Sequence, residues 1–338
     1  MVDAANCGRG KQVLKIVHVH FGNGPIPPPK YGGTERIIWN LAKYQRQAGH
    51  NVAVLAKTWA GTDSAISFRR YDPQSNLDAQ LDRDVDIVHF HSPGSYDIEA
   101  PYVCTEHGQS SAPVTHHKNT IYLSKSHAQI HHANFYIYNG LDWDDYGPPD
   151  FGQQRDVFHF LGKTSAPHKN LQGAIALANR AGRVLYIMGN RWHESLRLNR
   201  HRYFGRVTDA EKGAIIARSL GMLAPIRWHE PFGLAMVESL YHGAPLFGTP
   251  LGSLPELVPD ERVGMLSMNA DELLMAMQQR DRFDSRICHE LAVSEFNAAK
   301  MSDRYIEAYD RVTRGESLQP EPPHTDGSAG KLRDPFPA

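Results

Sequence analysis

The sequence predicts an α/β protein of two domains, each built on a parallel sheet covered by helices. The first observation is that short apolar strands alternate with helical segments in both halves of the chain. The second is that these strands are apolar on both faces, as in sheets buried between helical layers. The third is a break rich in Gly, Pro and Asp at residues 140–156, GLDWDDYGPPDFGQQRD, which we interpret as the domain boundary. A ligand cleft between the two domains is therefore expected.

The first domain is placed at residues 13–148, after a loose lead-in at 1–12. It opens with the strand KIVHVHF (15–21), and a helix follows with Thr34 as its expected N-cap and Gly49 as its stop. Further strands are expected at 50–57, 84–91, 102–108 and 135–140.

The second domain is placed at residues 149–300 and repeats the alternation without obvious sequence repetition. Its strands are expected at 157–163, 183–189, 222–226 and 244–249, and its helices near 170–182, 210–220 and 232–243. A final amphipathic helix is expected at 301–315. The remaining residues, 316–338, are rich in Pro, Gly and charge, and they are predicted to form a disordered tail.

Composition narrows the function classes. The formal net charge of −1 gives no electrostatic footprint for a polyanion, so no nucleic-acid partner is expected. Three distant cysteines form neither a CxxC pair nor a disulfide framework, which indicates a reducing compartment. No apolar run is long enough for a transmembrane helix or a signal peptide, so we expect a cytoplasmic protein without integral membrane contact.

The segment HEPFGLAMVE (229–238) carries a glutamate at each end of an apolar run. A helix starting near Phe232 would direct its first N–H groups toward the carboxyl edge of the sheet, where open parallel sheets bind ligands. Glu230 would lie in the loop before this helix and Glu238 about two turns into it. A carboxylate only accepts hydrogen bonds and suits a vicinal diol such as that of a ribose. The commoner alternative is a pair of solvent-facing glutamates.

Two loops at strand ends add candidate binding groups. Gly32 and Gly33 precede a helix N-terminus, where backbone can approach an anionic ligand, although a flexible turn would look the same. Lys163 and Lys169 lie in FLGKTSAPHKN (160–170) after a strand, and two cations there suit a diphosphate. Ordinary solvated lysines are the alternative.

Over roughly residues 13–315 the sequence resembles the retaining glycosyltransferases of family GT4. HEPFGLAMVESLYHGAPLFGTPLGSLPELV is similar to their E-x7-E signature region, and YGGTERIIWNLAKYQRQAGHNVAVLAK is similar to their N-terminal segment. Other similar segments, in the family's order, are DIVHFHSP, CTEHG, YLSKS, YNGLD and FLGKTSAPHKN. The compact layout is similar to small antibiotic-pathway members of the avilamycin type.

The resemblance implies a GT-B fold, in which two Rossmann-like domains face a central cleft. The C-terminal domain would bind most of the nucleotide sugar, and the N-terminal domain would hold the acceptor. Glu238 would bind the nucleotide ribose and Glu230 the hydroxyls of the donor sugar. Backbone N–H groups at Phe232, Gly233 and Leu234 would contact sugar and phosphate.

The remaining roles implied by the resemblance concern the reaction centre. Lys163 and Lys169 would stabilise the departing diphosphate, and Gly32 and Gly33 would approach it from the other domain. His107 would contact the donor sugar near the reacting carbon. The loop containing Arg206 is assigned to base recognition. The helix at 301–315 would cross back to the N-terminal domain.

The sequence departs from the family pattern at two positions. Lys163 stands where the family usually has arginine, which keeps the charge but loses the bidentate fork. Asn170 stands where many members have glycine. Neither change removes a required charge.

The resemblance also implies a reaction without cofactor or metal, because such enzymes lack an Asp-x-Asp metal site and none is convincing here. With no obvious nucleophilic carboxylate, same-face substitution with retained configuration is expected. A UDP-sugar is preferred slightly over a GDP-sugar as donor. The acceptor is left open between a glycan, a small molecule and a lipid-linked compound, and the last would place the protein at a membrane surface.

Nineteen histidines are the unusual feature of the composition. His18 and His20 alternate on one strand, as His89 and His91 do on another, so each pair shares one face. A rival hypothesis is therefore an amidohydrolase-like metal site made by His18, His20, His107 and an acid. A second rival is a GT-B-like protein that binds nucleotide or glycan without transfer.

Overall fold

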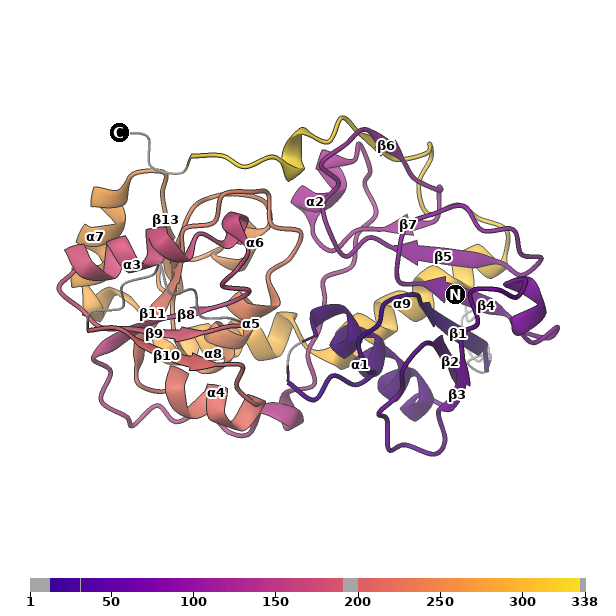
Figure 1. Ribbon diagram of the computed structural model, residues 1–338, viewed down its shortest axis with the longest axis horizontal. Helices are drawn as coiled ribbons and strands as arrows, with labels where there is room; N and C mark the ends of the chain where they lie inside the picture. Colours follow the sequence, from indigo (N-terminus) through magenta and orange to yellow (C-terminus); the bar gives the residue numbers. More distant parts are fainter. Residues whose placement is uncertain (1–12, 31, 191–199, 335–338) are drawn as a thin grey trace, which may run out of the picture.

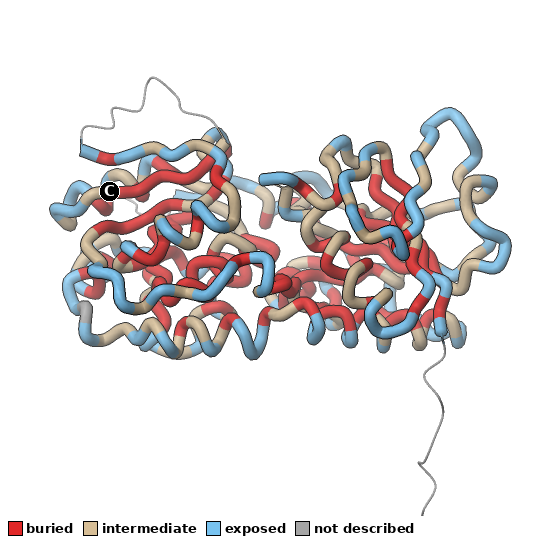
Figure 2. Tube along the Cα trace, turned by 90° about the horizontal axis from the view of Figure 1, so that it is seen from below, coloured by how far each residue is buried: buried red, intermediate tan, exposed pale blue. Residues whose placement is uncertain are grey.

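The computed structural model describes residues 13–334 except 31 and 191–199, so the lead-in at 1–12 lies outside the described residues. Two six-stranded parallel sheets form two domains side by side, each packed against helices (Figure 1). The buried stretches of the chain gather in the interior of each half (Figure 2). The predicted α/β class with two parallel sheets is confirmed.

The N-terminal sheet has the strand order β3-β2-β1-β4-β5-β7. This order reverses between β1 and β4, which creates the switch point where ligands bind in open sheets. The strands are β1 (Lys15–His20), β2 (Asn51–Ala56), β3 (Ser67–Arg70), β4 (Ile87–Phe90), β5 (Tyr102–Thr105) and β7 (Thr120–Ile121). Helices α1 (Gly33–Gln47) and α2 (Lys125–Ile130) and the short β6 (Val114–Thr115) complete the domain.

The C-terminal sheet repeats this arrangement in the order β10-β9-β8-β11-β12-β13, with its switch point between β8 and β11. Its strands are β8 (Val157–Leu161), β9 (Leu185–Met188), β10 (Arg202–Gly205), β11 (Ser219–Ala224), β12 (Leu246–Gly248) and β13 (Gly264–Leu266). Its helices are α3 (Leu171–Arg180), α4 (Asp209–Ile216), α5 (Leu234–Tyr241), α6 (Leu254–Leu257), α7 (Ala270–Gln278) and α8 (Ser285–Glu295).

Two segments connect the domains and lie side by side. The first contains Leu141, whose N–H donates to the carbonyl of Phe296 and whose carbonyl accepts from the N–H of Ala298. The second is α9 (Ala298–Thr313), which packs on α1 and buries Tyr305 and Tyr309 completely. One hydrophobic cluster consequently runs through residues of both domains.

Some local predictions were wrong. Helix α1 is capped by Gly32 and not by Thr34, because it starts one residue before that threonine. Residues 135–140 form no strand; Tyr136 makes one isolated bridge with Tyr122, since the chain already turns there toward the other domain. The edge strand β3 was missed because Ser67–Arg70 is largely exposed and carries no apolar pattern.

The prediction of a disordered tail also differs from the structure. The segment 316–334 first lies along the N-terminal domain, where β14 (His324–Thr325) pairs antiparallel with β6. The side-chain amide of Gln319 accepts from the N–H groups of Asn134 and Phe135 and donates to the carbonyls of Thr120 and Phe135. These polar contacts, together with the burial of Leu318 in the hydrophobic cluster, hold the tail in place, and its overall composition does not reveal them.

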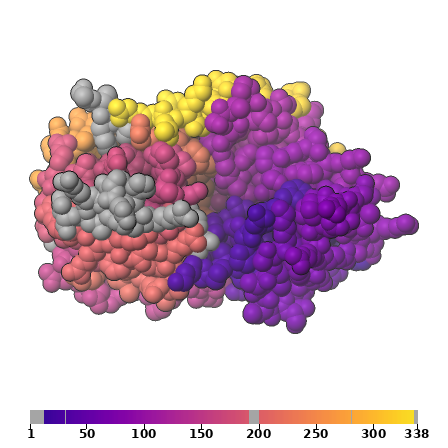
Figure 3. Space-filling model, viewed as in Figure 1, coloured from indigo at the N-terminus to yellow at the C-terminus, as the bar shows by residue number. Residues whose placement is uncertain are grey.

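The tail then continues to the second domain. The N–H of Arg333 donates to the carbonyl of Arg227 across 2.7 Å, and the Arg227 Nε donates back to the Arg333 carbonyl across 2.8 Å. The segment lies across both domains in yellow in Figures 1 and 3. Within the described part of the chain, no helix is both long and apolar enough to cross a bilayer.

Candidate active site

A cavity of about 350 Å³ lies between the domains and takes lining residues from both. It opens at the carboxyl ends of central strands, since residues that follow β5, β8 and β11 contribute to its wall. Every predicted site residue lines this one cavity. These residues are Gly32, Gly33, His107, Lys163, Lys169, Arg206, Glu230, Phe232, Gly233, Leu234 and Glu238.

Helix α5 begins at Leu234, two residues later than expected, with Gly233 as its N-cap. Gly233 has φ 95°, and a Cβ there would lie 2.3 Å from the Sδ of Met236, so only glycine fits. The side chain of Phe232 is buried in the core. No side-chain hydrogen bond caps this helix start, so the N–H groups of Gly233 and Leu234 have no partner within the helix.

Glu230 lies in the loop before α5 and is 6% exposed. Its Oε2 accepts from the Lys169 Nζ across 2.6 Å and from the Trp228 Nε1 across 2.8 Å. The loop is fixed from behind, because the N–H of Ser253 donates to the Glu230 carbonyl and Gly252 leaves no room for a Cβ against that backbone. The carboxylate therefore faces a cation in the cavity and not solvent.

Glu238 is equally enclosed, at 7% exposed. Its Oε1 accepts from the Lys212 Nζ across 2.6 Å and from the Tyr146 hydroxyl across 2.7 Å. Burial, together with this carboxylate, raises the pKa of the Tyr146 hydroxyl, which stays a donor at neutral pH. The alternative of two solvent-facing glutamates is thus excluded by their burial.

The Lys212 contact continues across the cleft. Its Nζ also donates to the Asp209 Oδ1 across 2.9 Å, and the Asp209 Oδ2 accepts from the Arg36 guanidinium across 2.8 Å. Since Arg36 belongs to α1, this chain of ion pairs links Glu238 to the N-terminal domain. The two domains also approach closely at Gly33, where an added Cβ would lie only 3.3 Å from the Leu234 Cδ1.

Sequence reasoning did not identify Arg36, Tyr146, Asp209, Lys212 or Trp228 as site residues. The one local signal nearby is the capping box of Thr208 and Glu211, which marks the start of α4 but not the partner of Lys212. The contacts of Arg36, Tyr146 and Lys212 with Asp209 or Glu238 join segments 173, 92 and 26 residues apart, which no local pattern shows. Trp228 lies only two residues before Glu230, but nothing in that spacing indicates a hydrogen bond.

Comparison with known proteins decides the family. The model of Glycosyltransferase Family 4 matches residues 31–143, and that of glycosyl transferases group 1 matches residues 155–280. Together these two matches cover well over half of the chain. The chain belongs to glycosyltransferase family 4.

Solved structures confirm the GT-B fold of this family 4 glycosyltransferase. AviGT4, a glycosyltransferase involved in avilamycin A biosynthesis, superposes with a TM-score of 0.74 at 22% identity, over 90% of this chain and 99% of that one. Anabaena Alr3699/HepE, in complex with UDP and glucose, gives a TM-score of 0.66 at 16% identity, over 88% of this chain and 99% of that one.

A curated sequence relative matches only in part. It is an uncharacterized 41.2 kDa protein in the cps region of Klebsiella pneumoniae, 30% identical over 114 residues. This match covers 32% of the glycosyltransferase chain and 31% of the relative.

The loop of the glycosyltransferase that carries Lys163 and Lys169 shows why asparagine can stand at position 170, where many family members have glycine. Asn170 has φ 54°, a left-handed conformation that glycine adopts most easily and asparagine tolerates. Its side chain also caps α3, because the Oδ1 accepts from the N–H of Gly173, and its Nδ2 donates to the carbonyl of Pro225. Asparagine is thus compatible with the backbone required beside Lys169. Lys163 is exposed at the cavity wall.

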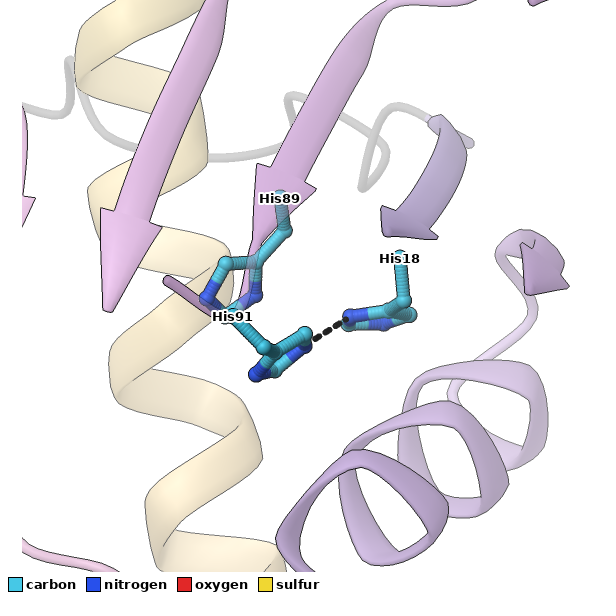
Figure 4. Close-up of side chains that lie close together, drawn as sticks. All are labelled: His18, His89 and His91. Carbon is cyan, nitrogen blue, oxygen red and sulfur yellow. Dashed lines mark hydrogen bonds between the residues drawn. The ribbon is translucent and has the colours of Figure 1, made fainter. Parts of the chain in front are cut away.

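The histidines that lie together in the glycosyltransferase are not the ones that the metal-site hypothesis combined. Three buried residues, His18, His89 and His91, each have one ring nitrogen within 4.8 Å of those of the other two (Figure 4). His20 lies instead beside Glu35, with its Nε2 3.6 Å from the Oε1. His107 lines the cavity, and burial lowers its pKa to about 3. Two open sheets also replace the single barrel that an amidohydrolase would have.

Proposed function

We propose that this glycosyltransferase transfers a sugar from a nucleotide-sugar donor to a hydroxyl acceptor, with retained anomeric configuration and without a metal. The observation that carries this proposal is the pair of buried glutamates, Glu230 and Glu238, set around the N-terminus of α5 in the cleft between two doubly wound domains. Two carboxylates in fixed positions suit the hydroxyls of a sugar and a ribose.

The donor would lie along α5. Its ribose would bind Glu238, whose second oxygen, Oε2, remains beside the one that Lys212 and Tyr146 contact. Its sugar would bind Glu230 and His107. A UDP-sugar is slightly preferred over a GDP-sugar as donor, by analogy with the UDP and glucose bound in Alr3699/HepE. The loop with Arg206 would contact the base.

The diphosphate would lie between the two domains. The first N–H groups of α5, at Gly233 and Leu234, and the ammonium groups of Lys163 and Lys169 suit its negative charge. Gly32 and Gly33 would let the opposite backbone approach. Lys169 is paired with Glu230, so the diphosphate would compete with that carboxylate for the Nζ.

The reaction that fits these groups is substitution on one face of the sugar. The bond from the anomeric carbon to the diphosphate oxygen breaks, and the acceptor oxygen bonds to the same carbon from the same side. The acceptor proton passes to the departing phosphate oxygen. Lysine charges and helix N–H groups, fixed in advance, would stabilise the charge on the diphosphate, and the enclosed cleft would hold both reactants together.

The acceptor would enter from the N-terminal domain side and could be a glycan, a small molecule or a lipid-linked compound. A non-catalytic binding protein is the second candidate function, since a cavity that binds a nucleotide sugar need not transfer it. Transfer itself distinguishes the two.

Thermal unfolding in the presence of UDP, GDP, ADP or TDP and their sugars, without added metal, tests the proposal. A ligand at about a hundred times its Kd stabilises the folded state by about 2.7 kcal/mol. One nucleotide should stand out, and Glu238→Ala should weaken its binding by about 1–3 kcal/mol, because ligand hydroxyls lose their acceptor. Unchanged nucleotide affinity in that variant would contradict the assigned role.

The configuration and the metal requirement are read from the product. NMR of the product formed from the selected donor, in the presence of a chelator, should show the same anomeric configuration as the donor. An inverted product, or activity that chelation abolishes, would refute the proposed chemistry. Tight donor binding with neither transfer nor sugar release would favour the non-catalytic alternative.

A further inference from the structure

We infer that Gln45 fixes the tautomer of His107 at the cavity through a relay of two buried histidines, His18 and His91. Gln45, His18 and His91 are then positioning residues, and Nδ1 of His107 is the unprotonated, accepting nitrogen of that ring. The consequence for sugar transfer rests on the proposed function, but the tautomers themselves do not.

The relay is a continuous series of short contacts from α1 to the cavity. The Gln45 Oε1 lies 2.8 Å from the His18 Nε2, the His18 Nδ1 lies 3.0 Å from the His91 Nε2, and the His91 Nδ1 lies 3.1 Å from the His107 Nε2. Gln45 and His18 are completely buried and His91 is 4% exposed, so water does not interrupt the series. Figure 4 shows the His18–His91 contact between β1 and the end of β4.

The direction of the hydrogen bonds follows from the amide. The Gln45 Oε1 can only accept, so the His18 Nε2 must carry the proton. Burial lowers the pKa of His18 to about 4 and that of His91 well below its usual value, so each ring has one proton at neutral pH. The His18 Nδ1 therefore accepts from His91 Nε2–H. The His91 Nδ1 in turn accepts from His107 Nε2–H.

A second series of contacts starts from the same amide and is compatible with this direction. The Gln45 Nε2 donates to the Tyr309 hydroxyl across 3.3 Å, and that hydroxyl lies 2.7 Å from the His89 Nδ1. The His89 Nε2 lies 2.7 Å from the Thr105 Oγ1, and the Tyr305 hydroxyl lies 3.1 Å from that same oxygen. Helix α9, which carries both tyrosines, thus contacts the relay from the side away from the cavity.

A metal site is the alternative use of this cluster. Both ring nitrogens of His18, His89 and His91 already have a hydrogen-bond partner within the protein. The rings of His89 and His91 lie one over the other and are tilted, with centroids 4.0 Å apart and planes at 32°. Metal ligands instead direct a lone pair from each ring edge at one shared point. The geometry favours the hydrogen-bonded relay.

The relay matters because a neutral histidine has one donor and one acceptor nitrogen. With its Nε2–H directed at His91, His107 has only an acceptor left for a sugar hydroxyl. The opposite tautomer would have a donor instead and would leave the His91 Nδ1 without a proton to accept. Buried groups beside the cavity therefore decide how His107 meets its ligand.

The test compares two substitutions of one residue in the full-length protein. Gln45→Glu keeps an acceptor opposite His18, and Gln45→Met has a similar shape without one. Ring ¹⁵N NMR at pH 7 should show the neutral Nε2–H form for His18, His91 and His107 in the parent and in Gln45→Glu. Gln45→Met should show a mixture of tautomers at His107, with backbone amide spectra confirming that both variants fold.

The outcomes are decisive without any activity. An Nδ1–H tautomer at His107 in the parent, or an unchanged His107 tautomer in a folded Gln45→Met, would overturn the relay. Stoichiometric zinc that stays bound through purification would overturn it in favour of a metal site. If a donor is found, Gln45→Met should also lower kcat at least about tenfold, with KM changing less. The reason is that His107 in the wrong tautomer slows the chemical step more than it weakens substrate binding.

Discussion

The ammonium of Lys212 donates to the Glu238 carboxylate across 2.6 Å, and these side chains belong to residues only 5% and 7% exposed. A buried carboxylate needs such a partner, because leaving one charge uncompensated costs far more than an exposed pair contributes. The same lysine contacts Asp209, which Arg36 of the other domain also contacts. The group that would receive the ribose is therefore held by residues that also hold the two domains together.

Replacing Lys212 by methionine should destabilise the folded protein by about 3–5 kcal/mol, because Glu238 and Asp209 lose their buried cation. Lys300→Met makes the same chemical change at an exposed pair with Glu295 and should cost at most about 1 kcal/mol. Urea unfolding of both variants checks this. Equal losses would show that the buried ion pair has no special weight. Nucleotide titration of Lys212→Met should also show weaker binding.

Lys169→Ala should lower turnover roughly 100-fold and donor affinity much less, if the ammonium mainly serves the charge that develops on the diphosphate. Single-turnover rates and the donor Kd, measured well below the melting temperature, separate the two effects. Lys300→Ala again serves as the control at an exposed lysine. A loss confined to donor binding would assign Lys169 to ground-state recognition.

Stability should fall as the pH falls from about 7 to 5. Burial lowers the pKa of His18 to about 4 and those of His107 and His159 to about 3, whereas an unfolded histidine titrates near 6.5. Below pH 6.5 the unfolded chain binds protons that the folded protein does not. Each such histidine therefore lowers the free energy of unfolding by up to about 1.4 kcal/mol per pH unit.

Urea unfolding at pH 8, 7, 6 and 5 measures this slope. The parent should have nearly constant stability above pH 7 and a steep loss below it. Replacing the buried His159 should flatten the slope, while replacing the exposed His324 should leave it unchanged. Equal stability at pH 5 and pH 8 would contradict the burial of neutral histidines.

Gln319→Ala should destabilise the protein by about 2–4 kcal/mol, because four hydrogen-bonding backbone groups lose their partner at a residue that is 1% exposed. Glu321→Ala, at an exposed position two residues along the tail, should change stability by less than about 0.5 kcal/mol. Protease should also cut the tail of Gln319→Ala faster than that of Glu321→Ala. Indistinguishable stability and cleavage would contradict the docked tail.

Much of this architecture could be predicted from the sequence. Apolar strands such as KIVHVHF, followed by helices with one apolar face, determine two parallel sheets, because only burial on both faces satisfies them. The residues of the segment 229–238 could be identified because the backbone conformation of a turn depends on neighbouring residues. Gly233 must adopt a positive φ before α5, and Glu230 and Glu238 flank that turn in the sequence.

The tertiary structure alone decided which partners those residues have. Lys212 meets Glu238 and Gln45 meets His18 because each domain folds, and Arg36 meets Asp209 because the two domains lie together. Such contacts depend on distance in space between segments far apart in the chain, which periodicity does not encode. The docked tail was missed for the same reason, since polar hydrogen bonds order it where its composition predicts disorder.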